Sequence, residues 1–85
     1  MGRYSVELKR SAAKEIKKLP VYDLKKILEV IEDLSENPRP PGSEKLSIGE
    51  KYRVRCGHYR ILYAIEDERL IVCVVKIAHR KDAYR

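Results

Sequence analysis

The stretch 52-YRVRCGHYRILYAIE-66 contains two runs in which every second residue is apolar. The pair Gly57-His58 separates the two runs, and a glycine there is typical of a tight turn between antiparallel strands. Successive side chains of a strand point to opposite faces of the sheet, so the alternating apolar residues of both runs lie on one face. The stretch therefore predicts a β-hairpin with one buried face.

The segments before and after this hairpin complete the predicted sheet. Residues 4–9 alternate apolar and polar side chains, which predicts a strand with one buried face. The run 70-LIVCVVKIA-78 is apolar on both faces, as expected of a strand in the middle of a sheet. Pairing of the first strand with the last places residues 70–78 inside the sheet, and we expect that arrangement.

Two helices are predicted between the first strand and the hairpin. The first is short, has Ser11 as its N-cap and ends near Pro20. The second ends at Asn37-Pro38 and carries an apolar stripe at helical spacing: Leu24, Ile27, Leu28, Ile31 and Leu34. The proline-rich residues 37–51 predict a loop. The fold class is therefore α+β, in the order β-α-α-β-β-β, with two N-terminal helices packed on one face of a small, mainly antiparallel sheet.

Length and composition restrict the kind of protein. A chain of 85 residues is expected to form one domain, 1–85, without a large apolar pocket, because it has no Trp and no Phe. Its start has no apolar run of signal-peptide length, and no segment approaches the roughly 20 apolar residues of a membrane span. We therefore expect a cytoplasmic protein with no membrane contact. Cys56 and Cys73 form no CxxC motif, so buried free thiols are expected rather than a disulfide or a metal site.

The net charge of +6 is unevenly distributed along the chain. Residues 11–36 carry five Lys and six acids, for −1, whereas residues 51–60 carry four cations and no acid, for +4. Residues 79–85 carry three cations and one acid, for +2. Clustered cations of this kind are typical of a nucleic-acid interface. The alternative is a basic face that only contacts solvent.

The three arginines of the hairpin are predicted to lie together. The alternation that buries Tyr52 and Val54 sends Arg53, Arg55 and Arg60 to the opposite face. Side chains at paired positions of adjacent strands lie about 5 Å apart, so these guanidinium groups repel one another unless an anion lies between them. Each guanidinium can hold a phosphate through two hydrogen bonds. The equally weighted alternative is that the charges only discourage sheets from pairing edge to edge.

The chain as a whole resembles the RelE/ParE superfamily of toxins, and its RelE-like branch in particular. The resemblance is carried by the order of elements, by 52-YRVRCGHYRILYAI-65 with its Gly-x-Tyr-Arg pattern, and by 77-IAHRKDAYR-85. It implies a type II toxin that a cognate antitoxin holds inactive. It also implies cleavage of mRNA in the ribosomal A site by attack of a 2′-OH on the adjacent phosphate, with no metal ion or other cofactor.

The resemblance also implies roles for individual residues. Arg53 and Arg55 bind phosphate and help to orient the nucleophile, and Arg60 stabilises the phosphate and the transition state. Arg80 is the matching basic residue just past the last strand, and Tyr84 stacks on a base or positions the 2′-OH. The expected catalytic set is Arg55, Arg60, His79, Arg80 and Tyr84. The expected RNA-binding set is Lys51, Arg53, Lys81 and Arg85.

The general base is the role that the resemblance leaves open. In the best-known RelE pattern the two hairpin-strand positions are lysines, and a crowded lysine loses its proton near neutral pH, whereas Arg53 and Arg55 do not. His79 is one candidate, because imidazole titrates near neutral pH and this residue precedes Arg80. Tyr84 is the other candidate, because neighbouring arginines lower the pKa of a phenol.

Two other functions are compatible with the same fold. One is a ParE-like inhibitor of DNA gyrase that is not a nuclease. The other is an inactive homologue that binds only its antitoxin and, through that complex, operator DNA. The possibility of an inactive homologue remains open, because Arg53 and Arg55 replace the two lysines of the best-known RelE pattern.

Overall fold

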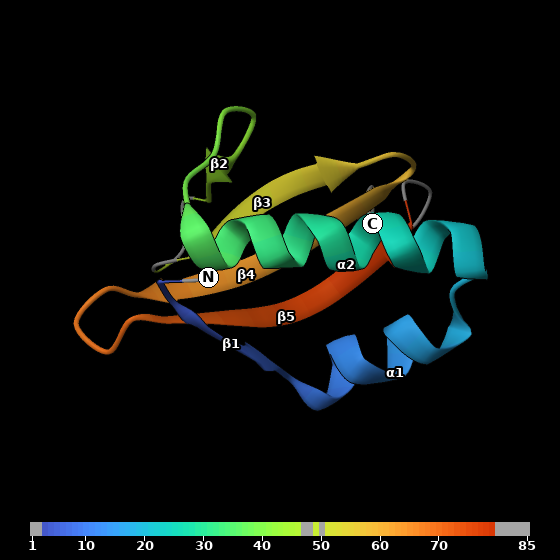
Figure 1. Ribbon diagram of the computed structural model, residues 1–85, viewed down its shortest axis with the longest axis horizontal. Helices are drawn as coiled ribbons and strands as arrows, with labels where there is room; N and C mark the ends of the chain where they lie inside the picture. The colour runs from blue at the N-terminus through green and yellow to red at the C-terminus, as the bar shows by residue number, and fades with distance from the viewer. Residues whose placement is uncertain (1–2, 47–48, 50, 80–85) are drawn as a thin grey trace.

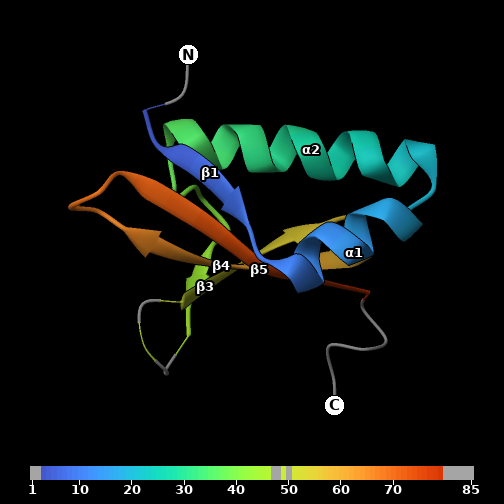
Figure 2. The same ribbon diagram turned by 90° about the horizontal axis from the view of Figure 1, so that it is seen from below.

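The computed structural model describes residues 3–46, 49 and 51–79 of the 85-residue chain. Two helices lie on one side of a five-stranded sheet (Figures 1 and 2). The elements are β1 (Ser5–Leu8), α1 (Arg10–Lys18), α2 (Val21–Glu36), β2 (Glu44–Lys45), β3 (Lys51–Cys56), β4 (Tyr59–Glu66) and β5 (Ile71–His79). The predicted α+β class and the helical cover on one face are confirmed. None of the described helices is long and apolar enough to cross a membrane.

The sheet has the strand order β1-β5-β4-β3-β2. The strands β1 and β5 pair in parallel, and the other three pairs are antiparallel. The prediction that the first strand pairs with the last is therefore confirmed. The strand β5 is inside the sheet, and its residues Ile71 and Val72 are buried although they point to opposite faces. This explains why residues 70–78 are apolar on both faces.

The short strand β2 was not predicted. It lies at the edge of the sheet, where Glu44 pairs with Arg53 and Lys45 pairs with Tyr52. Two residues are too few to show an alternating pattern, and the prolines around them indicated only a loop. The prediction of a loop over residues 37–51 is therefore wrong at Glu44–Lys45 and at Lys51, which begins β3.

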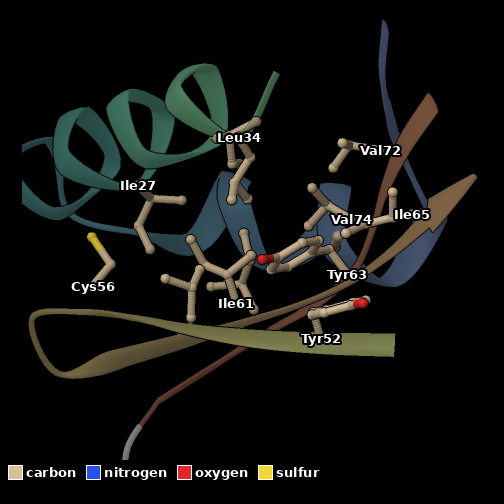
Figure 3. Close-up of a cluster of buried hydrophobic side chains, with 13 residues drawn as sticks. Ile27, Leu34, Tyr52, Cys56, Ile61, Tyr63, Ile65, Val72 and Val74 are labelled. Carbon is tan, nitrogen blue, oxygen red and sulfur yellow. The ribbon is translucent and has the colours of Figure 1, made fainter. Parts of the chain in front are cut away.

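The core lies between α2 and the covered face of the sheet (Figure 3). Ile27, Ile31 and Leu34 of α2 are buried and follow the helical spacing i, i+4 and i+7. Leu28 is 46% exposed, so the predicted stripe is too wide. Successive helix residues are about 100° apart around the axis, so Leu28 lies at the edge of the stripe that Ile27, Ile31 and Leu34 form. The buried face of the hairpin packs against this stripe, as predicted.

The start of α1 differs from the prediction in its cap. The N-cap is Lys9, and Ser11 lies inside the first turn. The Ser11 hydroxyl donates a hydrogen bond of 2.7 Å to the carbonyl oxygen of Val75. Val75 is the extra residue of a β-bulge, because Tyr63 pairs with Val74 and Leu62 pairs with Lys76. Ser11 therefore binds α1 to the bulge of β5 instead of capping the helix.

Polar side chains at the end of the sheet away from Gly57 form a connected network. Arg39 donates two hydrogen bonds to the Asp67 carboxylate, from Nη1 to Oδ1 at 3.2 Å and from Nη2 to Oδ2 at 2.9 Å. Its Nε donates to the hydroxyl of Tyr52 at 3.1 Å. The Tyr4 hydroxyl donates to Asp67 Oδ1 at 2.8 Å. The network joins the segment after α2 to β3, to the β4–β5 turn and to the start of the chain.

Replacing Asp67 by asparagine is expected to lower the melting temperature at pH 7. The hydrogen bonds from Arg39 and then Tyr4 hold the pKa of Asp67 below its ordinary value. Stabilisation by the carboxylate is therefore complete above the unfolded-state pKa, near pH 4, and is lost as the pH falls through the folded-state pKa. Thermal unfolding of both proteins from pH 7 to pH 2 measures this effect, and the difference should shrink only below about pH 4.

Glu68→Gln is the matched control for this experiment. It neutralises a carboxylate in the same turn that makes no ion pair with the described residues. Its melting temperature should stay close to that of the parent protein at every pH. A difference for Asp67→Asn that persists undiminished down to pH 2 would contradict the electrostatic explanation.

Candidate nucleic-acid interface

The face of the sheet away from the helices carries the cationic residues of the hairpin. Tyr52, Val54 and Cys56 of β3 are buried against the helices. The residues between them, Arg53 and Arg55, therefore point to the open face, together with Lys51. Arg60 of β4 pairs directly with Arg55 and shares its face. We call Arg53, Arg55 and Arg60 the arginine cluster.

The three members of the arginine cluster differ in their exposure. Arg55 is exposed, the side chain of Arg53 is 34% exposed and Arg60 is 9% exposed. The low exposure of Arg60 reduces the screening of its charge by water, so an anion beside it is held more strongly than at an open surface. Paired like charges repel one another, and a bound phosphate relieves this repulsion while accepting two hydrogen bonds from one guanidinium.

A carboxylate that the sequence analysis did not single out lies at the arginine cluster. Arg53 Nη2 donates to Glu44 Oε2 at 2.5 Å. The pKa of Glu44 is lowered, mainly by this hydrogen bond and by the charge of Arg53, and further by the charges of Arg55 and Arg60. All three guanidinium groups therefore lie close enough to stabilise one anion. No alternating pattern surrounds Glu44, so its position could not be predicted from the sequence.

Lys76 is a further cation of the open face, and the sequence analysis did not single it out. It pairs with Leu62, which in turn pairs with Arg53, so the three residues form a row across β5, β4 and β3. Strict alternation along β5 would have placed Lys76 on the buried face with Val72 and Val74. The bulge at Val75 reverses the alternation and turns Lys76 to the open face. A single cation within an apolar run was the available signal for such a bulge.

His79 does not join the arginine cluster. It pairs with Tyr59, whereas Arg60 pairs with Ala78, so the His79 side chain points to the helix-covered face. Its ring packs edge-on against Tyr59, with 5.2 Å between the ring centroids, and lies 6.3 Å from the ring of His58. The register of β5 with β4 therefore turns the His79 side chain away from the arginine cluster.

The structure also locates other residues that the sequence analysis discussed. Tyr52 and Tyr63 are core residues, as the alternation of the hairpin predicted. Their ring centroids are 5.9 Å apart, and the Tyr63 hydroxyl donates to the carbonyl oxygen of Pro38 at 2.7 Å. Cys56 is a buried free thiol whose pKa is raised by burial. Cys73 is also free but only half-buried, because it points to the open face. Arg80, Lys81, Tyr84 and Arg85 lie outside the described residues.

Within residues 3–46, 49 and 51–79, no three side chains of His, Cys, Asp or Glu are placed to hold a metal ion. The polar groups of the open face are guanidinium, ammonium and carboxylate groups. These groups are suited to bind a chain of phosphates, because cations lie on three adjacent strands of the open face and the arginine cluster stabilises a shared anion.

Comparison with known proteins gives matches over nearly the whole chain. The family profile described as "ParE toxin of type II toxin-antitoxin system, parDE" matches residues 6–84. The RelE1 protein of Methanocaldococcus jannaschii is 37% identical over 89 aligned positions, which cover 98% of this chain and 97% of the relative. The RelE–RelB complex of Pyrococcus horikoshii superposes with a TM-score of 0.83 and 26% identity, over 92% of this chain and 96% of that chain. The toxin–antitoxin complex RelBE2 of Mycobacterium tuberculosis gives 0.82 and 31%, over 94% of each chain.

Proposed function

Because this chain belongs to the RelE/ParE family of type II toxin–antitoxin toxins, we propose that it is a ribosome-dependent endoribonuclease. It cleaves mRNA in the ribosomal A site, stops translation and acts in the cytoplasm. The observation that supports this most is the arginine cluster, three guanidinium groups of one open face that act on a shared anion. An RNA phosphate takes the place of that anion in the proposed complex.

The proposed reaction needs no atoms beyond those of the RNA. The 2′-oxygen forms a bond to the adjacent phosphorus, and the bond from phosphorus to the 5′-oxygen breaks. One proton leaves the 2′-OH and one proton is added to the 5′-oxygen, which yields a cyclic phosphate and a 5′-OH end. The enzyme has to supply a proton acceptor, a proton donor and positive charge for the phosphorane.

Charge stabilisation, RNA binding and proton acceptance are proposed for residues of this chain. Arg55 and Arg60 hold the scissile phosphate and stabilise its developing charge, while Lys51 and Arg53 bind the neighbouring RNA backbone. Arg80 and Tyr84 complete the site. We assign proton acceptance to Tyr84 rather than His79, because the His79 ring packs on Tyr59 at the helix-covered face. Lys81 and Arg85 add positive charge for RNA binding, and no metal ion takes part in the proposed mechanism.

The proposed protein partner is a cognate antitoxin. The similar structures from Pyrococcus horikoshii and Mycobacterium tuberculosis are complexes of RelE with RelB and of a toxin with its antitoxin. A segment with acidic residues would complement the cations of the open face and would exclude RNA from it. Operator DNA is then reached only through the toxin–antitoxin complex.

Cell-free translation tests the proposed function directly. The protein is added to a translated message, and primer extension maps the cuts. We expect cuts inside codons that appear only when ribosomes are present. Intact message in the presence of active ribosomes would overturn the proposal.

The alternative function is inhibition of DNA gyrase, which is favoured by the ParE description of the matching family profile. The shared fold does not separate these activities. A gyrase inhibitor would stop DNA supercoiling before protein synthesis, and it would leave mRNA intact. Measuring both processes after induction in cells therefore distinguishes the alternatives.

A further inference from the structure

The edge strand β2 places a carboxylate at the end of the row of open-face residues Arg53, Leu62 and Lys76. Glu44 pairs with Arg53, Arg53 pairs with Leu62, and Leu62 pairs with Lys76. The Glu44 side chain is therefore on the same face as the proposed RNA site, and it makes an ion pair with Arg53. It is 62% exposed, so it does not serve the core.

The position of β2 is fixed from both of its ends. Before it, Arg39 binds Asp67 and the Tyr52 hydroxyl, which connects the segment after α2 to β3. After it, the backbone N–H of Leu46 donates to the carbonyl oxygen of Lys51 at 2.8 Å. Glu44 is thus held beside Arg53 by the fold and does not reach it only by chance motion of a loop.

We propose that Glu44 is an internal competitor for RNA phosphate, which occupies Arg53 in the unbound protein and releases it when RNA binds. This inference rests on the proposed function, because it assigns the same face to RNA. Glu44 accepts a hydrogen bond from Nη2 of Arg53. A phosphate that binds this guanidinium through two hydrogen bonds competes with Glu44 for Nη2. The competitor lowers the affinity for RNA and keeps the arginine cluster partly neutralised while the face is empty.

The expected effect is modest because the ion pair is exposed. Exposed ion pairs contribute little, so removing the competitor should raise RNA affinity about two- to fivefold. Release of Arg53 also adds about one phosphate contact. For single-stranded nucleic acid, each such contact makes the plot of log K against log salt concentration steeper by about 0.7. A change in slope therefore separates a new phosphate contact from a general gain in affinity.

Glu44→Gln tests the proposal, and Glu66→Gln is its matched control. Glu66 is also an open-face residue of β4 and also forms an ion pair, with Arg69, but it lies at the other end of the strand from Arg60. Both variants change the net charge by +1. The probe is a fluorescent single-stranded oligonucleotide with 2′-O-methyl riboses, which has no 2′-OH to attack. Fluorescence anisotropy across a salt series should show tighter binding and a steeper slope for Glu44→Gln only.

A second background tests whether the gain passes through Arg53. In Arg53→Ala protein, the further change Glu44→Gln should raise the affinity by less than it does in the parent protein, because only the weaker interactions of Glu44 with Arg55 and Arg60 remain. Equal or weaker binding by Glu44→Gln with an unaltered melting temperature would overturn the proposal. An equal gain in Glu66→Gln or in the Arg53→Ala background would also overturn it, and so would a lack of binding by every protein.

The binding assay contains no ribosome and no cleavage step, so its result is separate from that of the proposed function. If the message stays intact during translation but Glu44→Gln still binds RNA more tightly, the nuclease proposal fails and the competitor stands. If the parent protein cleaves mRNA and Glu44→Gln shows no gain, the competitor fails and the nuclease proposal stands.

Discussion

Arg60→Ala is expected to reduce ribosome-dependent mRNA cleavage by about 100- to 1,000-fold and to abolish growth arrest. Arg60 pairs with Arg55 across the hairpin and is only 9% exposed, so in the proposed complex water would screen its charge on the phosphate only weakly. Loss of this group leaves the charge of the phosphorane without its least solvated partner. Primer extension at a series of times after mixing measures the rate, and growth after induction measures the toxicity.

Arg69→Ala is the control for the loss of one positive charge. Arg69 is exposed and pairs with Glu66 at the other end of β4, away from the arginine cluster. Its removal should leave the cleavage rate within about twofold of the parent, because surface changes of this kind have small effects. Arg60→Lys keeps the charge but loses the planar fork, so we expect an intermediate rate. Full toxicity of Arg60→Ala, with normal folding by circular dichroism, would refute the assigned role.

The fold is predictable from sequence where an element is long enough to show its period. The hairpin residues 52–66 alternate over both runs, and Gly57 has the positive φ of 61° that its turn position requires. The apolar residues on both faces of β5 indicate its position inside the sheet. The strand β2 is only two residues long and is held by pairing with β3, so no local pattern reveals it. Such an element depends on contacts that form only after the rest has folded.

The candidate site is predictable from sequence only where the alternation is unbroken. Strict alternation along β3 and β4 is enough to place Arg53, Arg55 and Arg60 on one face. Along β5 the bulge at Val75 breaks the alternation, and the sequence alone does not assign Lys76 to the open face. His79 lies beyond the same bulge, and its pairing with Tyr59 determines the face to which it points. Its closeness to Arg80 in the sequence does not reveal this pairing.

The same bulge connects the core to the open face. It allows Ile77 to be buried at 1% exposure while Lys76 points to the opposite side, and it frees the Val75 carbonyl oxygen to accept the Ser11 hydroxyl. One irregularity of β5 therefore sets which of its last residues face the helices and which face the open side. We therefore expect any use of the open face to depend on how the helices pack on the other side of the sheet.

Leu34→Ala is expected to destabilise the protein by about 2–5 kcal/mol. Leu34 is fully buried between α2 and the sheet, so its truncation removes apolar contacts and leaves a cavity in the core (Figure 3). A domain of this size has a total stability of about 4–13 kcal/mol, so the loss is a large fraction of it. The melting temperature should fall by more than about 10 °C, as measured by circular dichroism or calorimetry.

Leu28→Ala makes the same substitution in the same helix and isolates the effect of burial. Leu28 is 46% exposed, so its truncation should cost less than about 1 kcal/mol. Leucine and alanine have similar helix propensities, and both variants change α2 by the same atoms, so the difference between them reports the core contact. If the two variants melted at the same temperature, α2 would not pack on the sheet through Ile27, Ile31 and Leu34. The orientation that leaves the arginine face uncovered would then lose its support, because that orientation follows from the side on which α2 packs.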